Sequence, residues 1–404
     1  MASTSYLYHN HKIKKYKYVN TTYQSGTTIF KIEKDEHFCG KCGSRNVTLD
    51  NMNTRRIQTL PIGFRQVFLE VDVWRCNCSN CGTRQTENVS FIPHKKSRIS
   101  RALIKMIIEL RCKMTIAGIE EKYGINWKTI KNCEKEYLKK KSKRKRLKDV
   151  KAIGIDEIYI SPKHRKYITI VRDLDSGDVL HVGEGKGVDA LKQFTKRLNC
   201  SKHKIKTIAM DMSKSFQAWA KEVLPQADIV FDHFHVIKLM NAKVNSVRIS
   251  TMKELDDEQK KSLTGQKYLF LTAEEKLKKD RFKKLKKLRN MFKDLGEINL
   301  MKEYLRGIYR NVIDPLIAEG ALVDWCEMAG ESSITGLKQM AKTIRNHING
   351  IVAFWKTDGI TNAAMEGFNT KVRWLIKQAY GYRDMEYFYY KIYDLPKRKI
   401  QVVI

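Results

Sequence analysis

The chain has 404 residues, of which 42% are hydrophobic and 30% are charged, a balance typical of folded globular proteins and not of disordered chains. Its 78 Lys and Arg residues outnumber its 44 Asp and Glu residues, which gives a formal net charge of +34. Such an excess favours a polyanionic partner such as nucleic acid, although a generally lysine-rich composition is the alternative. Because the sequence has neither a bilayer-length apolar run nor a signal peptide, we expect a cytoplasmic protein with no membrane partner.

The first predicted segments are a lead-in and a strand-rich module. Residues 1–35 are polar, rich in Tyr, Lys and Thr and only weakly periodic, so we expect a flexible N-terminal lead-in. Residues 36–92 contain segments with the sequence pattern of β-strands, between pairs of cysteines. From Val67 to Val73 every second residue is apolar, which predicts a strand with one buried face.

Two C-x2-C pairs lie in this module, Cys39 with Cys42 and Cys78 with Cys81, and each pair is followed by glycine. Each pair turns two thiolates toward one point, and two pairs supply the four sulfur ligands that tetrahedral Zn²⁺ accepts. The long interval between the pairs suits a ribbon with a hairpin. Cys76 competes with Cys78 for one ligand position, but only Cys78 has the x2 spacing to Cys81. We therefore expect a structural zinc ion and no disulfide framework, the alternative being four unligated thiols.

Residues 97–140 are predicted to be helical. Thr115 is the expected N-cap of a short helix that ends at Gly124, and Asn126 is the expected N-cap of the next helix. Two short helices joined through a glycine turn match the helix-turn-helix plan of DNA-binding domains, although an ordinary helical hairpin is the alternative. In the second helix Ile130, Cys133 and Tyr137 are expected to face inward, and the residues expected to contact DNA are Lys128, Thr129, Lys131 and Asn132.

A basic linker at 141–149 precedes an abrupt change of periodicity. Three short β-rich segments are followed by a helix, a strand, a helix and a strand. The order βββαβαβ is that of the ribonuclease H fold, an α/β class with a mixed sheet and helices on both faces. The predicted parts are the first part of this core at 150–240, with its last strand at 227–236, an all-helical insertion at 241–355, and C-terminal helices of the core at 356–404.

Three acidic residues are candidates for a metal site. Asp156 lies within the apolar strand segment AIGIDEIYI, and Asp211 lies near the end of the strand segment IKTIAMDM, where an unpaired carboxylate is costly to bury. Because the first and fourth strands of this topology are neighbours, we expect both carboxylates to lie close together. Glu366 lies in the early turns of a helix expected to be capped near Thr361 or Asn362, and it would complete a site for two Mg²⁺. Each acid could instead be structural, and the rival acids are Glu157, Asp173 and Glu184.

Together these motifs resemble the DDE transposases of bacterial insertion sequences in the ISL-three (ISL3) group. The likeness runs from about Cys39 to the C-terminus, through WRCNCSNCG, MTIAGIEEKYGINWKTI, IGIDE, IAMDMSKSF, DIVFDHFHVIKLMNAKVNSVR, GQKYLFL and DGITNAAMEGFNTKVRWLIKQAYGYRDMEYF. The last motif is the most specific, because its acid, Gly, Asn and basic residues precede an aromatic-glycine turn at the family's spacings. The departure is Cys76, which makes the second knuckle C-x-C-x2-C.

The resemblance implies roles for particular residues. Asp156, Asp211 and Glu366 occupy the positions of the acidic triad. Asp232 and His235 match an aspartate-x-x-histidine element that would brace the site or contact DNA, although a polar pair at a strand end is the alternative. Glu366 follows Asp211 by 155 positions, and the resemblance implies that this long interval holds an all-helical insertion.

The implied activity is Mg²⁺-dependent hydrolysis at transposon ends, followed by attack of the freed 3′-OH on target DNA. Its implied partners are double-stranded DNA and further copies of the chain, as a homodimer or higher oligomer, in a nucleoid-associated, bacterial cytoplasmic setting. Lys371, Arg373 and Lys377 are expected near the phosphates; Trp374 and Trp355 could stack on a displaced base, but core packing is favoured for both. The alternatives are a non-catalytic DNA-binding regulator derived from a transposase and a ribonuclease-H-like structure-specific nuclease.

Overall fold

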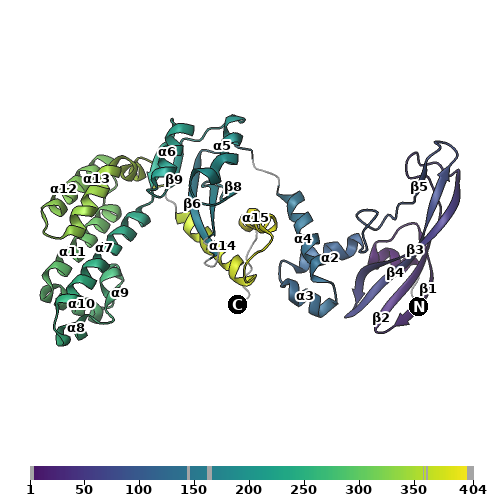
Figure 1. The fold of residues 1–404 in the computed structure, drawn as a ribbon, viewed down its shortest axis with the longest axis horizontal. Helices are drawn as coiled ribbons and strands as arrows, with labels where there is room; N and C mark the ends of the chain where they lie inside the picture. Colours follow the sequence, from purple (N-terminus) through teal and green to yellow (C-terminus); the bar gives the residue numbers. More distant parts are fainter. Residues whose placement is uncertain (1–3, 143–145, 162–165, 358, 361–362, 398–404) are drawn as a thin grey trace. The chain divides into compact units, whose positions relative to one another are not determined.

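The computed structural model describes residues 4–142, 146–161, 166–357, 359–360 and 363–397. The chain forms two compact units, Met1–Lys143 and Arg144–Ile404, and Figure 1 labels most of their helices and strands. Each unit has its own apolar core, so each is described by itself. Within the described ranges, no helix combines the length and the apolar character needed to cross a membrane.

The N-terminal unit begins with a five-stranded sheet of order β1-β2-β4-β3, in which β5 also pairs with β4. Strands β2 and β4 are parallel and the other pairs are antiparallel. The elements are α1 (Thr4–His11), β1 (Tyr16–Gln24), β2 (Thr27–Lys34), β3 (Val47–Ile62), β4 (Arg65–Cys78) and β5 (Arg84–Thr86).

The expected flexible lead-in over residues 1–35 is wrong. Residues 4–34 contain α1, β1 and β2, and β2 joins the sheet alongside β4. Leu7, Phe30 and Ile32 are buried there against the apolar face of β4. Burial of these side chains offsets the conformational entropy of ordering a segment whose own sequence is mostly polar.

The strand predicted around Val67–Val73 is confirmed as part of β4. Val67, Leu69, Val71 and Val73 are at most 3% exposed, and they alternate with half-buried residues of the outer face. On the outer face Glu70 pairs with Arg56 of β3 at 3.0 Å. The hairpin expected between the cysteine pairs is formed by β3 and β4, and it turns at Gly63, whose φ of 60° favours glycine.

Three helices complete this unit: α2 (Arg101–Leu110), α3 (Ile116–Tyr123) and α4 (Trp127–Lys141). The predicted caps are confirmed, because the side chains of Thr115 and Asn126 accept backbone hydrogen bonds at the starts of α3 and α4, and Gly124 ends α3 in a left-handed conformation. The helices share a small core, and the backbone of Gln58 in β3 bonds to Ser100 at 2.9 Å, which ties them to the sheet.

One expectation for α4 is wrong. Tyr137 is 39% exposed, whereas Leu138 is buried. The buried face follows i, i+4 spacing through Ile130, Glu134 and Leu138, and Glu134 is held inside by a 2.7 Å ion pair with Arg111. The buried Glu134 therefore determines which face of α4 points inward, and a search for apolar periodicity does not detect it. Helix α4 ends at Lys141, and residues 143–145 of the predicted basic linker lie outside the described residues.

The second unit contains the predicted ribonuclease-H-like sheet, in the order β10-β9-β6-β7-β8. Strands β6, β7 and β8 are antiparallel neighbours, whereas β9 is parallel to β6 and β10 is parallel to β9. The predicted order of elements is confirmed, as is the adjacency of the first and fourth strands. The elements are β6 (Ala152–Ser161), β7 (Lys166–Asp173), β8 (Val179–Glu184), η1 (Val188–Leu191), α5 (Lys192–Asn199), β9 (Thr207–Met210), α6 (Lys214–Val223) and β10 (Asp228–Phe231).

Helices cover both faces of this sheet (Figure 1). Ile155 of β6 packs on one face with Phe194 of α5 and Trp219 of α6. Ile158 of the same strand packs on the other face with α14 and α15, including Phe368 of α14. Because successive residues of a strand point to opposite faces, residue 156 faces α14 and residue 157 faces η1. The last elements are α14 (Ala363–Gln378), α15 (Met385–Asp394) and η3 (Leu395–Lys397).

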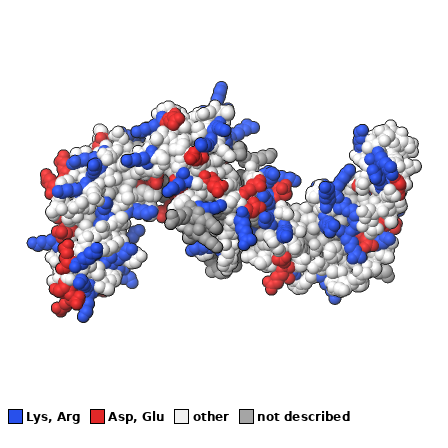
Figure 2. Space-filling view, in the orientation of Figure 1, with Lys and Arg blue, Asp and Glu red and all other residues white. Residues whose placement is uncertain are grey.

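Between β10 and α14 the described residues are helical or irregular, as predicted for the insertion. The last core strand, expected through 227–236, ends instead at Phe231, because the carboxylate of Asp232 accepts a hydrogen bond from the Phe234 amide at 3.1 Å and caps α7. Figure 2 shows Lys and Arg interspersed with Asp and Glu over this helical segment. Its elements are α7 (His233–Glu254), α8 (Asp257–Leu263), α9 (Lys267–Leu271), η2 (Glu274–Lys276), α10 (Lys279–Met291), α11 (Lys293–Asn311), α12 (Pro315–Glu331) and α13 (Thr335–Lys356).

Candidate functional site

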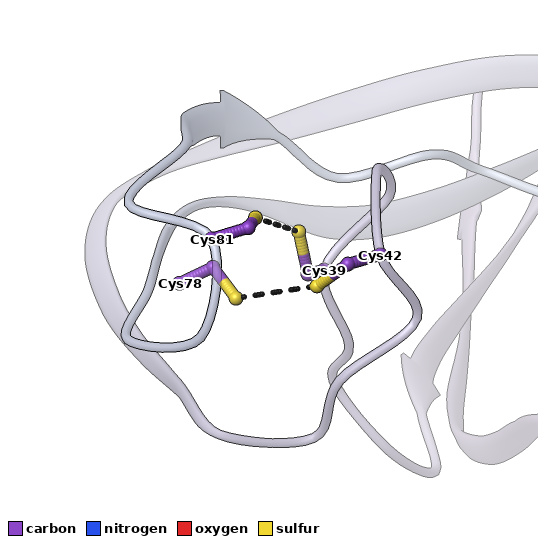
Figure 3. A group of neighbouring side chains, drawn as sticks. All are labelled: Cys39, Cys42, Cys78 and Cys81. Atoms are coloured by element: carbon purple, nitrogen blue, oxygen red, sulfur yellow. Dashed lines mark hydrogen bonds between the residues drawn. The ribbon is translucent and has the colours of Figure 1, made fainter.

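The two cysteine pairs form one cluster in the N-terminal unit. Figure 3 shows the four side chains directed toward one another, with Cys39 and Cys81 sulfurs 3.6 Å apart and Cys42 and Cys78 sulfurs also 3.6 Å apart. All four sulfur atoms lie within 4.8 Å of one another, and all four thiols are free of disulfides. Four converging thiols match the ligand set of a structural zinc ion.

The backbone builds both knuckles in the same way. Gly43 and Gly82 adopt φ values of 75° and 64°, and their amides donate to the carbonyls of Cys39 and Cys78 at 2.9 Å. The amide of Lys41 also points at the Cys39 sulfur, at 3.4 Å. Amide donors of this kind orient thiolate ligands and stabilise their charge.

The competition between Cys76 and Cys78 is settled by geometry. Cys76 lies in β4 opposite Leu49, is 2% exposed, and is not part of the sulfur cluster. Burial raises the pKa of its thiol to about 11, which disfavours the thiolate that a metal needs. Cys78, at the end of the strand, joins Cys81 in the second knuckle as the x2 spacing predicts.

In the second unit, Asp156 and Asp211 lie side by side. Gly154 of β6 is in register with Ala209 of β9, so the parallel strands bring residues 156 and 211 to the same level. Asp156 is half-buried, and burial raises the pKa of its carboxyl, to which the negative charge of Asp211 adds. The amide of Ser213 donates to Asp211 Oδ1 at 3.0 Å and the amide of Glu157 donates to Asp156 Oδ1 at 2.8 Å.

The rival acids have other surroundings. Glu157 points to the face that carries η1, where its Oε1 accepts the Gly187 amide at 3.1 Å. Asp173 is paired with Ile153 at the opposite end of the sheet, and it accepts the Ser176 hydroxyl at 2.6 Å inside a turn. Glu184 is exposed at the end of β8 and pairs with Lys166 at 3.9 Å. Asp156 is thus the acid of β6 that faces α14.

Glu366 lies in the first turn of α14, as predicted, and its side chain is exposed. The predicted capping residues Thr361 and Asn362 lie outside the described residues. One turn after Glu366, the amide of Asn369 donates to Asp156 Oδ2. Asn369 is 2% exposed and was not among the predicted site residues; its spacing of three from Glu366 is the signal that could have identified it.

The three acids do not form a closed cage. Among the described residues, the cysteine cluster is the one group of three or more His, Cys, Asp and Glu side chains whose ligand atoms all lie within 4.8 Å. The acids form a more open arrangement: two acids on neighbouring strands, and Glu366 on the helix that Asn369 fastens to the first strand. Such an arrangement is wider than the site of one small cation with a complete set of protein ligands.

Asp232 and His235 lie at the end of β10, beside β9. Phe231 is in register with Met210, so Asp232 follows its strand next to Asp211. Asp232 is 2% exposed and caps α7, and His235 Nδ1 is 3.9 Å from its Oδ2. The charge of His235 lowers the pKa of Asp156, against the effect of burial, which places the imidazole within electrostatic reach of the acids.

The basic residues Lys371, Arg373 and Lys377 are exposed on α14. Core packing is confirmed for Trp355, which is 8% exposed and donates Nε1 to the Val312 carbonyl at 2.9 Å. For Trp374 it is wrong, because this side chain is 61% exposed. The buried stripe of α14 runs through Phe368 and Val372 instead, and Trp374 lies off that stripe beside Lys377, whose Nζ is 5.9 Å from the indole ring.

On α4, the four residues expected to contact DNA differ in exposure. Lys128 and Asn132 are exposed, whereas Thr129 and Lys131 are half-buried. Lys128 lies over the ring of Trp127, at 5.6 Å, and that ring is itself 45% exposed. The exposed part of the helix therefore combines a cation, an amide and an aromatic ring.

Comparisons with known proteins agree with this architecture. The family model described as Transposase, of the ISL3 type, matches residues 153–392, and the model for the zinc-finger of transposase IS204/IS1001/IS1096/IS1165 matches residues 35–81. The chain is 26% identical to the transposase for insertion sequence element IS1001 of Bordetella parapertussis, over 88% of this chain and 87% of that one. It is 24% identical to the transposase for insertion sequence element IS1557 of Mycobacterium tuberculosis, over 85% and 82% of the two chains.

Among solved structures, the Drosophila P element transposase strand transfer complex aligns with 74% of this chain and 92% of that chain, at 11% identity and a TM-score of 0.42. The sheet order, the helical insertion and the cysteine ribbon define a ribonuclease-H-like protein with an N-terminal zinc ribbon. The chain belongs to the ISL3 family of insertion-sequence transposases, whose family model covers more than half of its length.

Proposed function

We propose that this transposase cleaves DNA at the ends of its insertion sequence and joins them to target DNA, using Asp156, Asp211 and Glu366 to hold two Mg²⁺. The main support is the register of β6 and β9, which brings the first two acids together beside the helix that carries the third. Burial and the charge of Asp211 both raise the pKa of Asp156. A divalent cation bound beside it would stabilise the ionised carboxylate and so offset both effects.

In this proposal the chain's own groups hold and orient the reacting parts. Two bound Mg²⁺ would activate the attacking oxygen and stabilise the leaving one. Asp156 and Asp211 would hold the ions from the sheet, and Glu366 would hold them from α14. Asn369 fixes the rotation of the Asp156 carboxylate, and Asp232 with His235 braces the end of β10 beside Asp211. In the first step water breaks a phosphodiester, which leaves a 3′-OH and a 5′-phosphate. In the second, that 3′-OH forms a new phosphodiester with a target-strand phosphate, whose original bond breaks and releases the target's own 3′-OH.

Exposed residues of α14 would hold the DNA at this site. Lys371, Arg373 and Lys377 continue along the helix from Glu366, and each adds a positive charge that a DNA phosphate can neutralise. Trp374 is exposed between Arg373 and Lys377, where an unpaired base could stack on it. The exposure of this indole supports the stacking role over the packing role.

The N-terminal unit would read the transposon ends. We assign residues 36–92 to the zinc ribbon and 97–140 to a helix-turn-helix domain, with α4 as the recognition helix. The residues proposed to contact DNA are Lys128, Thr129, Lys131 and Asn132. Bringing two ends together would require at least a homodimer, and such a DNA-bound assembly would be nucleoid-associated.

A cleavage and joining assay with end-bearing DNA and Mg²⁺ tests the proposal, comparing the wild-type chain with Asp156→Ala. We expect both steps in the wild type and neither in the variant. Activity that survives the substitution would remove Asp156 from the site. Cleavage without joining would favour a nuclease, and inactivity of both proteins with intact DNA binding would favour a regulator.

A further inference from the structure

The hairpin formed by β6 and β7 extends beyond the acidic site. Strand β9 pairs with β6 only from Ala152 to Gly154, so the part of β6 that follows Asp156 has β7 as its strand neighbour. On this projecting arm Tyr159 and Tyr167 are directly opposite each other. Their ring centroids are 4.9 Å apart and the rings are inclined by 48°.

These two rings line a cavity of about 700 Å³, which we call the tyrosine pocket; its lining residues are Tyr159, Lys166, Tyr167, Glu184, Gly185 and Lys186. Tyr159 is 42% exposed, so part of its ring is open to a ligand. Lys186 Nζ is 5.4 Å from the Tyr167 ring, and Lys166 pairs with Glu184 at 3.9 Å. The pocket therefore presents aromatic faces, two cations and one carboxylate.

The pocket follows the acidic site along β6 but lies on the other face of the strand, the face of Glu157. Glu157 and Tyr159 are two residues apart on one strand and so share a face. Glu157 Oε1 accepts the amide of Gly187 at 3.1 Å, directly after Lys186 of the pocket. Tyr159 is three positions after Asp156, or about 10 Å along the strand. That span equals about three stacked nucleotides of one DNA strand, or fewer if the strand is extended.

We infer that the tyrosine pocket binds an unpaired nucleobase of the DNA strand beside the cleavage point. This inference rests on the proposed function, and it adds a binding site for a particular nucleotide. Stacking on an aromatic ring requires an exposed base face, which paired bases inside a duplex do not offer. Lys166 and Lys186 supply cations for the flanking phosphates. The Glu184 carboxylate can accept a hydrogen bond from an exocyclic amino group, which adenine, guanine and cytosine have and thymine lacks.

The test measures binding of full-length, zinc-loaded protein to transposon-end DNA whose flanking nucleotides are unpaired, with Ca²⁺ in place of Mg²⁺ to prevent cleavage. The variant is Tyr159→Ala with Tyr167→Ala. We expect its affinity for the unpaired DNA to fall about tenfold, and its affinity for fully paired DNA to change less than twofold. Removing the base at the pocket position, as an abasic site, should make both proteins bind with equal affinity.

Two further variants separate stacking from loss of fold. Tyr159→Phe with Tyr167→Phe keeps both rings and should bind like the wild type. Tyr268→Ala is the matched control, because Tyr268 is 67% exposed and also lies near a lysine, with Lys267 Nζ 5.6 Å from its ring, but it belongs to α9. If the double alanine variant is poorly folded, Tyr159→Ala alone removes the more exposed ring and should give a smaller loss of the same kind.

Equal affinity of the wild-type and double alanine proteins for unpaired DNA would overturn the inference, as would a loss of equal size on abasic DNA. Cleavage in Mg²⁺ is measured separately on the same DNA. If the wild-type protein cleaves normally but the double alanine variant binds unpaired DNA with the same affinity, only the assignment of the tyrosine pocket is refuted. A chain that never cleaves, yet loses base-dependent binding in the variant, refutes the proposed function and supports the pocket.

Discussion

Asn369 of α14 donates a hydrogen bond to Oδ2 of Asp156 on β6, although 213 positions separate the two residues in the sequence. The other oxygen of the same carboxylate accepts the amide of Glu157 at 2.8 Å. Both oxygens of Asp156 therefore have fixed donors, which hold the carboxylate in one rotation while other lone pairs stay available for a cation. The bond also fastens α14 to the strand one turn after Glu366.

We predict that Asn369→Ala raises the Mg²⁺ concentration needed for half-maximal cleavage by about 10- to 100-fold, because the carboxylate loses the donor that orients it. Cleavage at saturating Mg²⁺ should recover more than cleavage at low Mg²⁺. Thr370→Ala, at the exposed neighbouring position of the same helix, is the control and should leave the Mg²⁺ dependence unchanged. An unchanged Mg²⁺ dependence in Asn369→Ala would show that this bond only packs the helix.

Replacing Cys78 and replacing Cys76 should have opposite effects on the amount of zinc bound. Cys78→Ser removes a sulfur from the cluster, so we expect it to lose the bound zinc and to expose the β3–β4 hairpin to hydrogen exchange. Cys76→Ser changes a buried thiol outside the cluster, and it should keep one zinc ion per chain. Metal content measured by mass spectrometry decides the matter, and loss of zinc from Cys76→Ser with retention in Cys78→Ser would reverse the ligand assignment.

The two tryptophans also differ in what their removal should do. Trp355→Ala creates a cavity in the helical core and should lower the free energy of unfolding by about 3–5 kcal/mol. Trp374→Ala removes a mostly exposed side chain, so thermal unfolding should be nearly unchanged while DNA binding weakens. A large loss of stability in Trp374→Ala, with unaltered DNA affinity, would return this residue to a packing role.

The stability of the N-terminal unit should depend on the titration of His11. Its ring is 2% exposed, and burial lowers its pKa from 6.5 to about 4. Between these two values the unfolded chain binds a proton that the folded chain does not, so the stabilisation is complete above pH 6.5 and is lost as the pH falls toward 4. The slope approaches about 1.4 kcal/mol per pH unit in that window.

Hydrogen exchange of the β2 and β4 amides, measured from pH 7 to pH 4.5 in excess zinc, detects this change. His11→Gln does not titrate there, and its profile should be flatter than that of the wild type. The zinc ligands contribute equally to both proteins, so their protonation cancels in the comparison. Parallel profiles for the two proteins would exclude His11 as the source.

Much of this fold could be predicted from the sequence, because its signals are local. Alternating apolar residues identified β4, and the capping side chains of Thr115 and Asn126 fixed the starts of α3 and α4. The order of elements implied that the strands of Asp156 and Asp211 would be neighbours, which the register confirms. Each of these features depends on a few consecutive residues or on topology alone.

The remaining features depend on distant partners. The strands of residues 16–34 form because β2 pairs with the edge of β4 and packs on its apolar face. No local sequence pattern predicts this pairing. Tyr137 faces solvent because Arg111 draws Glu134 inward, and β10 ends early because Asp232 caps α7. Asn369 was not predicted, because its role depends on its hydrogen bond to Asp156, which is 213 positions away in the sequence.

The central claim is tested most directly by the rate of DNA end cleavage in Mg²⁺ for four single variants. Asp156→Asn, Asp211→Asn and Glu366→Gln each remove one carboxylate charge and should each lower the rate on the order of a thousandfold. Glu157→Gln changes the adjacent acid on the opposite face of β6 and should stay within about tenfold of the wild type. Near-normal cleavage by any of the first three, or a loss confined to Glu157→Gln, would contradict the assignment of the metal-binding acids.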